Sequence, residues 1–185
     1  MKKFLLVLVL FLFVTSTVWG FNGMRKGFIL GGGLGLGMTS YQEELSGYKF
    51  DRVNRFAIMT DFKIGYAPNQ QWEIYYSDKS SWFDAGSVIA LHGVGTAAVN
   101  YYVKPLAPTF YLSGGLGFAT ISTPFEDNSD TDIGLGMFAG AGYEFAKHFA
   151  VQFDFMFGMP QESSSGVDYT FTGLTPRVSV IATAF

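Results

Sequence analysis

Seven charged residues lie at positions whose side chains are predicted to face the interior of a β-structure. Three are basic and four are acidic: Arg55, Asp61, Lys63, Glu73, Glu144, Asp154 and Arg177. Isolated charges in a narrow interior are costly to desolvate, so these are expected to pair and hydrogen-bond with one another. The pattern therefore predicts an ion-pair network that plugs the interior. The alternative is a gate, in which the pairs exchange partners and let ions pass.

The same sequence offers little support for catalysis or a zinc site. The carboxylates are scattered, and nothing pairs them with a base or a water site. The chain has no Cys and only two His, whereas a zinc site needs several clustered ligands. His92 shares a strand face with Thr96, but a nucleophile and a base are not brought together by the sequence. We therefore expect no enzyme, cofactor or metal site, and we expect His92 to be an interior residue with a satisfied hydrogen bond.

The elements that must position these residues are strands, because apolar residues recur at every second position. In Phe149–Gly158, for example, Phe153 and Phe155 share one face while Gln152 and Asp154 share the other. Gly31–Gly37 alternates with Leu inside a strand rather than opening a helix, which argues against a phosphate-binding loop. The eight predicted strands are Gly27–Thr39, Arg55–Tyr66, Gln71–Ser77, Ser87–Val103, Phe110–Ile121, Asp132–Phe145, Phe149–Gly158 and Tyr169–Phe185.

The connections between these strands differ in length in a regular way. Those after the second, fourth and sixth strands are short, and the other four are long. Short turns at one end and long loops at the other are typical of an outer-membrane barrel, whose even strand number puts both chain ends in the periplasm. The sequence therefore predicts an all-β fold, an eight-stranded antiparallel transmembrane up-and-down β-barrel. Pro176 lacks a backbone N–H and predicts a bulge in the last strand.

Residues 1–20 have the three parts of a secretory signal peptide. Lys2 and Lys3 precede the apolar run Phe4–Val14, and smaller residues follow up to Gly20. The apolar run is shorter than the roughly 20 residues that a helix needs to cross a bilayer. We therefore expect cleavage after Gly20, with an uncleaved anchor as the alternative, and a barrel domain over residues 21–185.

The composition favours a membrane barrel over a nucleic-acid-binding protein. Hydrophobic residues make up 49% of the chain, which contains 20 Phe, 10 Tyr and 23 Gly. An apolar exterior with aromatic girdles needs such residues. The formal net charge is −3 and becomes more negative when Lys2 and Lys3 are removed. No nucleic-acid partner is expected, because phosphate binding needs clustered Lys and Arg.

Three segments and the final residue carry a family resemblance: 99–102 (VNYY), 113–118 (SGGLGF), 140–145 (GAGYEF) and Phe185. In their order and spacing, the mature chain resembles the small eight-stranded outer-membrane barrels, the opacity-protein or OmpA-like barrel group. Members of such families include structural barrels, adhesins, conduits for small solutes or hydrophobes, and a few lipid-modifying enzymes. The resemblance implies a bacterial outer-membrane location.

The leading functional prediction is a non-enzymatic integral outer-membrane protein with a side-chain-filled lumen and a structural or surface-interaction role. The alternative is a narrow porin-like conduit for ions or small solutes. Expected partners are outer-membrane lipid, lipopolysaccharide, and the barrel-assembly machinery through the strand that ends in Phe185. No extracellular partner is identified by the sequence. The long loops are acidic, which leaves open either ordinary solvated loops or divalent cations shared with lipopolysaccharide phosphates.

Overall fold

The computed structural model of this chain is an antiparallel β-barrel, described over residues 24–126, 131–164 and 167–185. The predicted signal peptide, residues 1–20, lies outside the described residues. The strands are β1 (Gly27–Leu45), β2 (Tyr48–Lys49), β3 (Val53–Ala67), β4 (Trp72–Asp84), β5 (Ile89–Tyr102), β6 (Thr109–Ser122), β7 (Thr131–Ala146), β8 (Phe149–Ser164) and β9 (Val167–Ala184).

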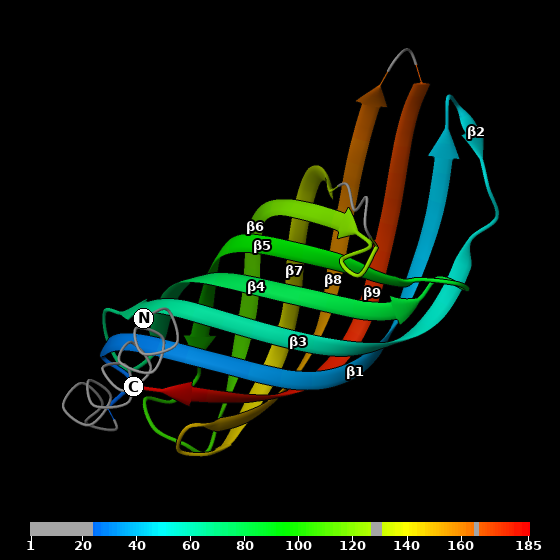
Figure 1. Ribbon diagram of the computed structural model, residues 1–185. Coiled ribbons are helices and arrows are strands. Elements are labelled where there is room, and N and C mark those ends of the chain that lie inside the picture. The colour runs from blue at the N-terminus through cyan, green and yellow to red at the C-terminus, as the bar shows by residue number, and fades with distance from the viewer. Residues whose placement is uncertain (1–23, 127–130, 165–166) are drawn as a thin grey trace, which may run out of the picture.

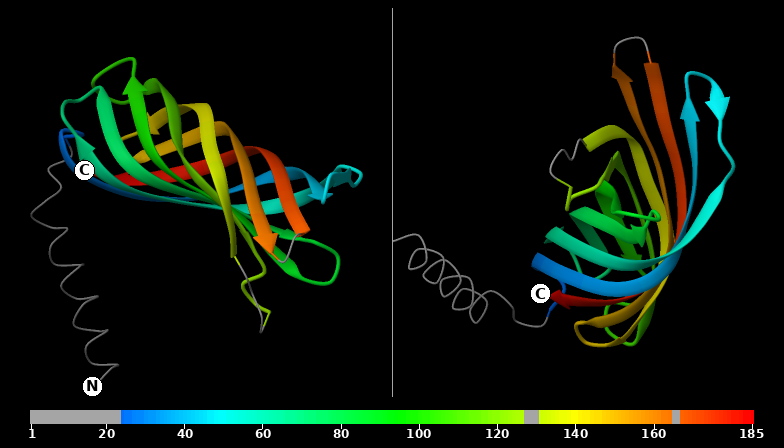
Figure 2. Two further views of the ribbon diagram at one scale, coloured as in Figure 1. Left: turned by 90° about the horizontal axis from the view of Figure 1, so that it is seen from above. Right: turned by 45° about the vertical axis from the view of Figure 1, so that its right-hand side comes forward.

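Eight of these strands form the barrel wall in sequence order, and β1 pairs with β9 to close it. The two-residue strand β2 only pairs with the upper end of β1. This confirms the predicted all-β, eight-stranded up-and-down barrel. β1 begins and β9 ends at the same end of the barrel, which we call the turn end (Figure 1). Two hairpins, β1–β2 and β8–β9, extend beyond the other strands at the opposite end, the loop end (Figure 2).

The barrel wall is apolar outside and polar inside. On β8, Phe149, Val151, Phe153 and Phe155 are exposed, whereas Gln152 and Asp154 between them are buried. Most of the wall follows the same alternation, with many large apolar side chains exposed. One exception is residues 78–81 of β4, where the outward positions are the polar residues Asp78 and Ser80. An apolar surface of this extent indicates a lipid-facing exterior. Among the described residues, no helix is long and apolar enough to span a membrane.

The glycine-rich face of β1 is explained by close approach inside the lumen. A Cβ on Gly33, Gly35 or Gly37 would lie 2.2–2.4 Å from its nearest neighbour, closer than real Cβ contacts allow. The neighbours that need this space are atoms of β9 and, beside Gly37, also Met59. The small residues of β1 therefore make room for a filled interior.

Three predicted strand limits differ from the structure by more than two residues. β1 continues to Leu45, six residues past the predicted end, and β8 continues to Ser164. β4 continues to Asp84, although the polar run after Ser77 suggested a loop. At Pro176 the predicted bulge is absent: the β8–β9 register is the same on both sides of the Phe155–Pro176 pair. The barrel has a register shift instead in β7, between Glu144 and Ala146.

Candidate functional site

The middle of the lumen holds a group of four alternating charges, which we call the central cluster: Asp61, Lys79, Asp154 and Arg177. The Nζ atom of Lys79 lies 2.8 Å from Oδ1 of Asp61 and 3.1 Å from Oδ2 of Asp154. Arg177 bridges the same two acids, with Nε 3.0 Å from Oδ1 of Asp154 and Nη2 in contact with Asp61. Gln152 also donates a hydrogen bond to Asp154. Each acid is therefore held by two cations.

Strand register brings these four residues together. Lys79 on β4 stands directly opposite Asp61 on β3, and Arg177 on β9 stands directly opposite Asp154 on β8. Opposite charges at facing positions stabilise a pair of strands. Two such cross-strand pairs then meet inside the barrel, with all four side chains at most 7% exposed.

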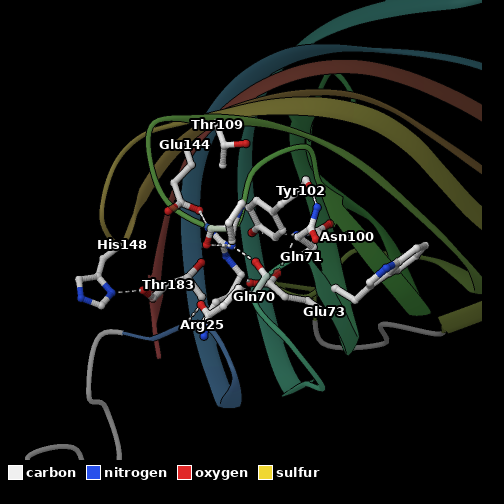
Figure 3. A network of polar contacts seen from close by, with 12 residues as sticks. Arg25, Gln70, Gln71, Glu73, Asn100, Tyr102, Thr109, Glu144, His148 and Thr183 are labelled. Carbon is white, nitrogen blue, oxygen red and sulfur yellow. Dashed lines mark hydrogen bonds and ion pairs between the residues drawn. The ribbon is translucent and has the colours of Figure 1, made fainter.

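A second group, the turn-end cluster, closes the lumen where β1 begins: Arg25, Lys63, Glu73 and Glu144. Figure 3 shows Arg25 with Glu73 and Glu144. Lys63 Nζ lies 3.1 Å from Glu73 Oε2, and Asn100 donates a hydrogen bond to the same oxygen. Arg25 Nη2 donates to Glu144 Oε2 at 2.7 Å, while its Nε lies 3.9 Å from Glu73 Oε1.

Arg25 precedes β1, and its side chain fills the opening of the lumen at the turn end, which we call the mouth. Its side chain is 2% exposed, and its guanidinium carbon lies 3.6 Å from the centre of the Tyr102 ring. It also donates hydrogen bonds to the backbone carbonyls of Gln70 and Pro105, which belong to two different turns. One residue thus ties the start of β1 to the ends of β3, β5 and β7 (Figure 3).

Arg55 stands apart from the other six residues that the sequence singled out. It faces inward near the loop end, opposite Thr39, and only part of its side chain is buried. No ion pair involves Arg55 among the described residues, and its buried Nε lacks a hydrogen-bond partner there. Arg55 therefore belongs to neither the central cluster nor the turn-end cluster by its contacts, and its role in the network stays a prediction.

Sequence reasoning also missed two cations, Arg25 and Lys79. Arg25 lies before the first alternating segment, so periodicity carried no information about it. Lys79 falls between the predicted strands that end at Ser77 and begin at Ser87, although the inward positions Glu73, Tyr75 and Ser77 continue to Lys79 in β4. With both included, the two clusters contain four cations and four anions.

An apolar layer fills the lumen between the central cluster and the loop end. Its buried members include Tyr41, Met59, Phe83 and Phe171, and the Tyr41 ring lies 5.4 Å from Phe83 and 5.2 Å from Phe171. His92 is fully buried at this level, with its ring 5.2 Å from Phe171.

His92 is an interior residue, as expected, but it lacks the predicted hydrogen bond. Neither ring nitrogen has a partner among the described residues, and the Thr96 hydroxyl also has none. A Cβ at Gly158 would lie 2.3 Å from His92 Nε2, so the ring fits only because that position is glycine. His92 and Thr96 therefore form no nucleophile–base pair.

Little free space remains between these layers. A cavity of about 20 Å³ lies between the clusters, bordered by Asp61, Lys79 and Asn100, and one of about 10 Å³ lies near Tyr111 and Glu144. Each has room for roughly one water molecule. Within the described residues, no group of three or more potential ligands could hold a metal ion.

The sequence matches no family model and no curated protein sequence. Among solved structures, the outer membrane protein OprG from Pseudomonas aeruginosa is similar, with a TM-score of 0.50, 14% identity, and coverage of 87% of this chain and 97% of that one. Neisserial surface protein A matches with a TM-score of 0.47 and 15% identity over 83% of this chain and 97% of that chain. Ail of Yersinia pestis matches with a TM-score of 0.44 and 16% identity over 84% and 99%.

These likenesses concern the fold. At 14% identity, the match with OprG reflects a similar chain arrangement rather than a similar sequence. The chain thus has the fold of the small eight-stranded outer-membrane β-barrels.

Proposed function

We propose that this chain is an integral outer-membrane protein with a closed lumen and a non-enzymatic structural or surface-interaction role. The observation that carries the proposal is the sequence of three packed layers along the lumen. The turn-end cluster, the central cluster and the apolar layer follow one another along the lumen, and two cavities between their residues measure about 20 and 10 Å³. A lumen filled in this way suits a barrel that serves through its wall and its loops.

The apolar exterior supports the membrane location. Aromatic residues mark both rims of the exposed apolar band, with Tyr66, Trp72 and Phe110 near the turn end and Phe56 near the loop end. Aromatic girdles are typical of the two interfaces of an outer-membrane barrel. Short turns at one end and longer hairpins at the other support an orientation with the turn end in the periplasm.

The surface that could meet an extracellular partner is the loop end. The β1–β2 and β8–β9 hairpins project there (Figure 2), and Tyr48, Phe50 and Phe125 are exposed among acidic residues. Lipopolysaccharide is the surrounding lipid on that side. The barrel-assembly machinery is a proposed transient partner of the last strand, since Phe185 is buried once the barrel is closed.

A narrow conduit is the second candidate, and one observation favours it. Lys79 and Arg177 each contact the same two acids, so the central cluster has more than one way to pair its charges. An exchange of partners would not strand any single charge, and it could open a path for small ions.

Single-channel conductance of the refolded barrel separates the two candidates. We expect no discrete openings for the wild type, for Asp61→Asn or for Glu73→Gln. The matched control is Glu44→Gln, which removes an exposed acid paired with Lys49 at 3.6 Å outside the lumen. Openings in the wild type that change with Asp61→Asn and Glu73→Gln, but not with the control, would overturn the closed lumen in favour of the conduit.

A further inference from the structure

The exterior of the barrel has a shallow depression at the turn end of the β1–β9 seam. It consists of two adjoining hollows of about 440 and 380 Å³ that share Gly32 and Ala182. Leu30 and Leu34 on β1 border it, together with Val180 and Phe149, and His148 lies at its lower end. Elsewhere at this level the wall presents bulky side chains such as Phe62, Trp72 and Phe110.

Packing inside the barrel does not require a small residue at Gly32. A Cβ added there would have its nearest neighbour at 3.4 Å, an ordinary contact, in contrast to the lumen-facing glycines of the same strand. Position 32 faces outward, and because glycine has no side chain, the surface is hollow there. Its floor and walls are apolar, which is suited to an acyl chain.

The exposed charged side chains around this end of the barrel are all basic. Among the described residues at the turn end, the exposed charged side chains are Lys26, Lys104 and Lys147. The acids at this end, Glu73 and Glu144, are buried and already paired within the turn-end cluster. At the loop end, acids outnumber bases among the exposed and partly exposed side chains, with Glu43, Glu44, Asp51, Asp84, Glu126, Asp132, Glu162 and Asp168 against Lys49, Arg52 and Arg55.

We call the exposed lysines of the turn end the basic rim. His148 borders the hollow and directly follows Lys147 of this rim. Its Nδ1 lies 2.8 Å from the carbonyl oxygen of Thr183, so Nδ1 donates the proton of that hydrogen bond and Nε2 is left for another partner (Figure 3). Its ring also packs 4.6 Å from the ring of Phe185, which fixes its orientation. Lys147 is the preceding residue and is exposed.

We infer that this hollow and rim bind an anionic phospholipid of the periplasmic leaflet. One acyl chain lies over Gly32 and Ala182, and the headgroup phosphate lies against Lys147. The phosphate also accepts a hydrogen bond from Nε2 of His148 when both ring nitrogens carry a proton. The inference rests on the proposed membrane orientation, with the turn end in the phospholipid leaflet. A basic residue near an anionic headgroup contributes about 1 kcal/mol, which is roughly a fivefold preference over a zwitterionic lipid.

The test is native mass spectrometry of the barrel released from nanodiscs that contain equal amounts of phosphatidylcholine and phosphatidylglycerol. We expect the wild type to retain phosphatidylglycerol preferentially. Lys147→Gln and His148→Gly should each reduce that preference about fivefold. His148→Gly is compatible with the turn, because His148 has a φ of 76°, a left-handed conformation that glycine adopts readily.

Two matched variants test the hollow itself. Gly32→Leu fills it and should abolish retention of the lipid. Gly114→Leu adds the same side chain to an outward position on β6, where a Cβ would likewise lie 3.5 Å from its nearest neighbour, and should leave retention unchanged.

The inference is overturned if the wild type retains both lipids equally, or if Gly32→Leu and Gly114→Leu behave alike. Insertion is measured separately, from refolding into vesicles and the heat-dependent shift of the folded band on a gel. A wild type that does not insert would overturn the membrane proposal as well. A wild type that inserts without lipid preference would overturn only the lipid site.

Discussion

The two charge clusters of the lumen have the same composition, two cations and two anions, but they are built in different ways. In the central cluster, all four residues come from strands, and both cross-strand pairs follow directly from register. In the turn-end cluster, the residues paired by charge do not stand opposite one another: Lys63 faces Ser77, and Glu73 faces Asn100. Lys63 and Glu73 lie on the neighbouring strands β3 and β4, and their long side chains span the offset between them along the barrel axis. Arg25 precedes the strands altogether.

The central cluster is therefore fixed by strand pairing, whereas part of the turn-end cluster is independent of it. A register slip of one residue would turn Asp61 or Arg177 out toward lipid, so the central cluster and the strand pairing specify each other. Arg25 can leave the turn-end mouth without breaking any strand pair. The central cluster therefore belongs to the stability of the barrel, and the turn-end cluster to its closure.

The largest effect is expected from Arg177→Met, which removes one of two cations from the central cluster. Asp61 and Asp154 then share only Lys79. Removing one partner of a buried ion pair lowers the free energy of unfolding by about 3–5 kcal/mol. Urea unfolding of the refolded barrel, followed by tryptophan fluorescence, measures the change in the free energy of unfolding. A loss below about 1 kcal/mol, the range of exposed pairs, would contradict a structural role for this cluster.

A smaller loss of stability is expected from Arg25→Ala, about 1–3 kcal/mol, because Glu144 lies at the mouth and removal of Arg25 would let water reach it. The distinguishing result is access to the lumen. The chain has no Cys, so a single Ser77→Cys reports on the space between the clusters, where Ser77 is 2% exposed. We expect a small water-soluble thiol reagent to label Ser77→Cys faster when Arg25 is Ala.

The control for that experiment is the same thiol in the Lys49→Ala background, which alters only an exposed pair at the loop end. Equal labelling rates in the Arg25→Ala and Lys49→Ala backgrounds would mean that Arg25 does not close the mouth.

The smallest effect is expected from Arg55→Gln, which sharpens the contrast with Arg177. Arg55 makes no ion pair among the described residues, so its removal leaves no buried acid without a partner. The change in the free energy of unfolding should stay within about 0.5 kcal/mol, as for substitutions away from buried networks. A loss comparable to that of Arg177→Met would show that Arg55 belongs to the network after all.

The sequence predicted the wall of the barrel better than its contents. The alternation of Phe153 and Phe155 with Asp154 reports which side chains face the lumen, because the side-chain period of a strand is two. It does not report which strands bring their charges to the same height, since that depends on register. Asp154 and Arg177 could therefore be placed inside, but their pairing could not be derived.

The errors have physical causes of the same kind. Residues 78–81 (DKSS) are polar on both faces, so the apolar signal of β4 fades before the strand ends. Hydrogen bonding to the neighbouring strands carries β4 on to Asp84. Arg25 lies in a segment without periodicity. Its position follows from contacts with two turns and the end of β7, all distant from it in the sequence.

The seam between β1 and β9 has a consequence for how the barrel forms. It pairs Leu30 with Ala184 and continues to Leu45 with Tyr169, so the contacts that close the barrel join the two extremes of the described chain. Every other wall pairing is a local hairpin and can form as soon as its two strands are present. The chain must lose the entropy of closing this long loop before the hydrogen bonds of the seam can form. We therefore expect closure to be the slow step of folding. Until then β1 and β9 are both open edges, each able to pair with another chain.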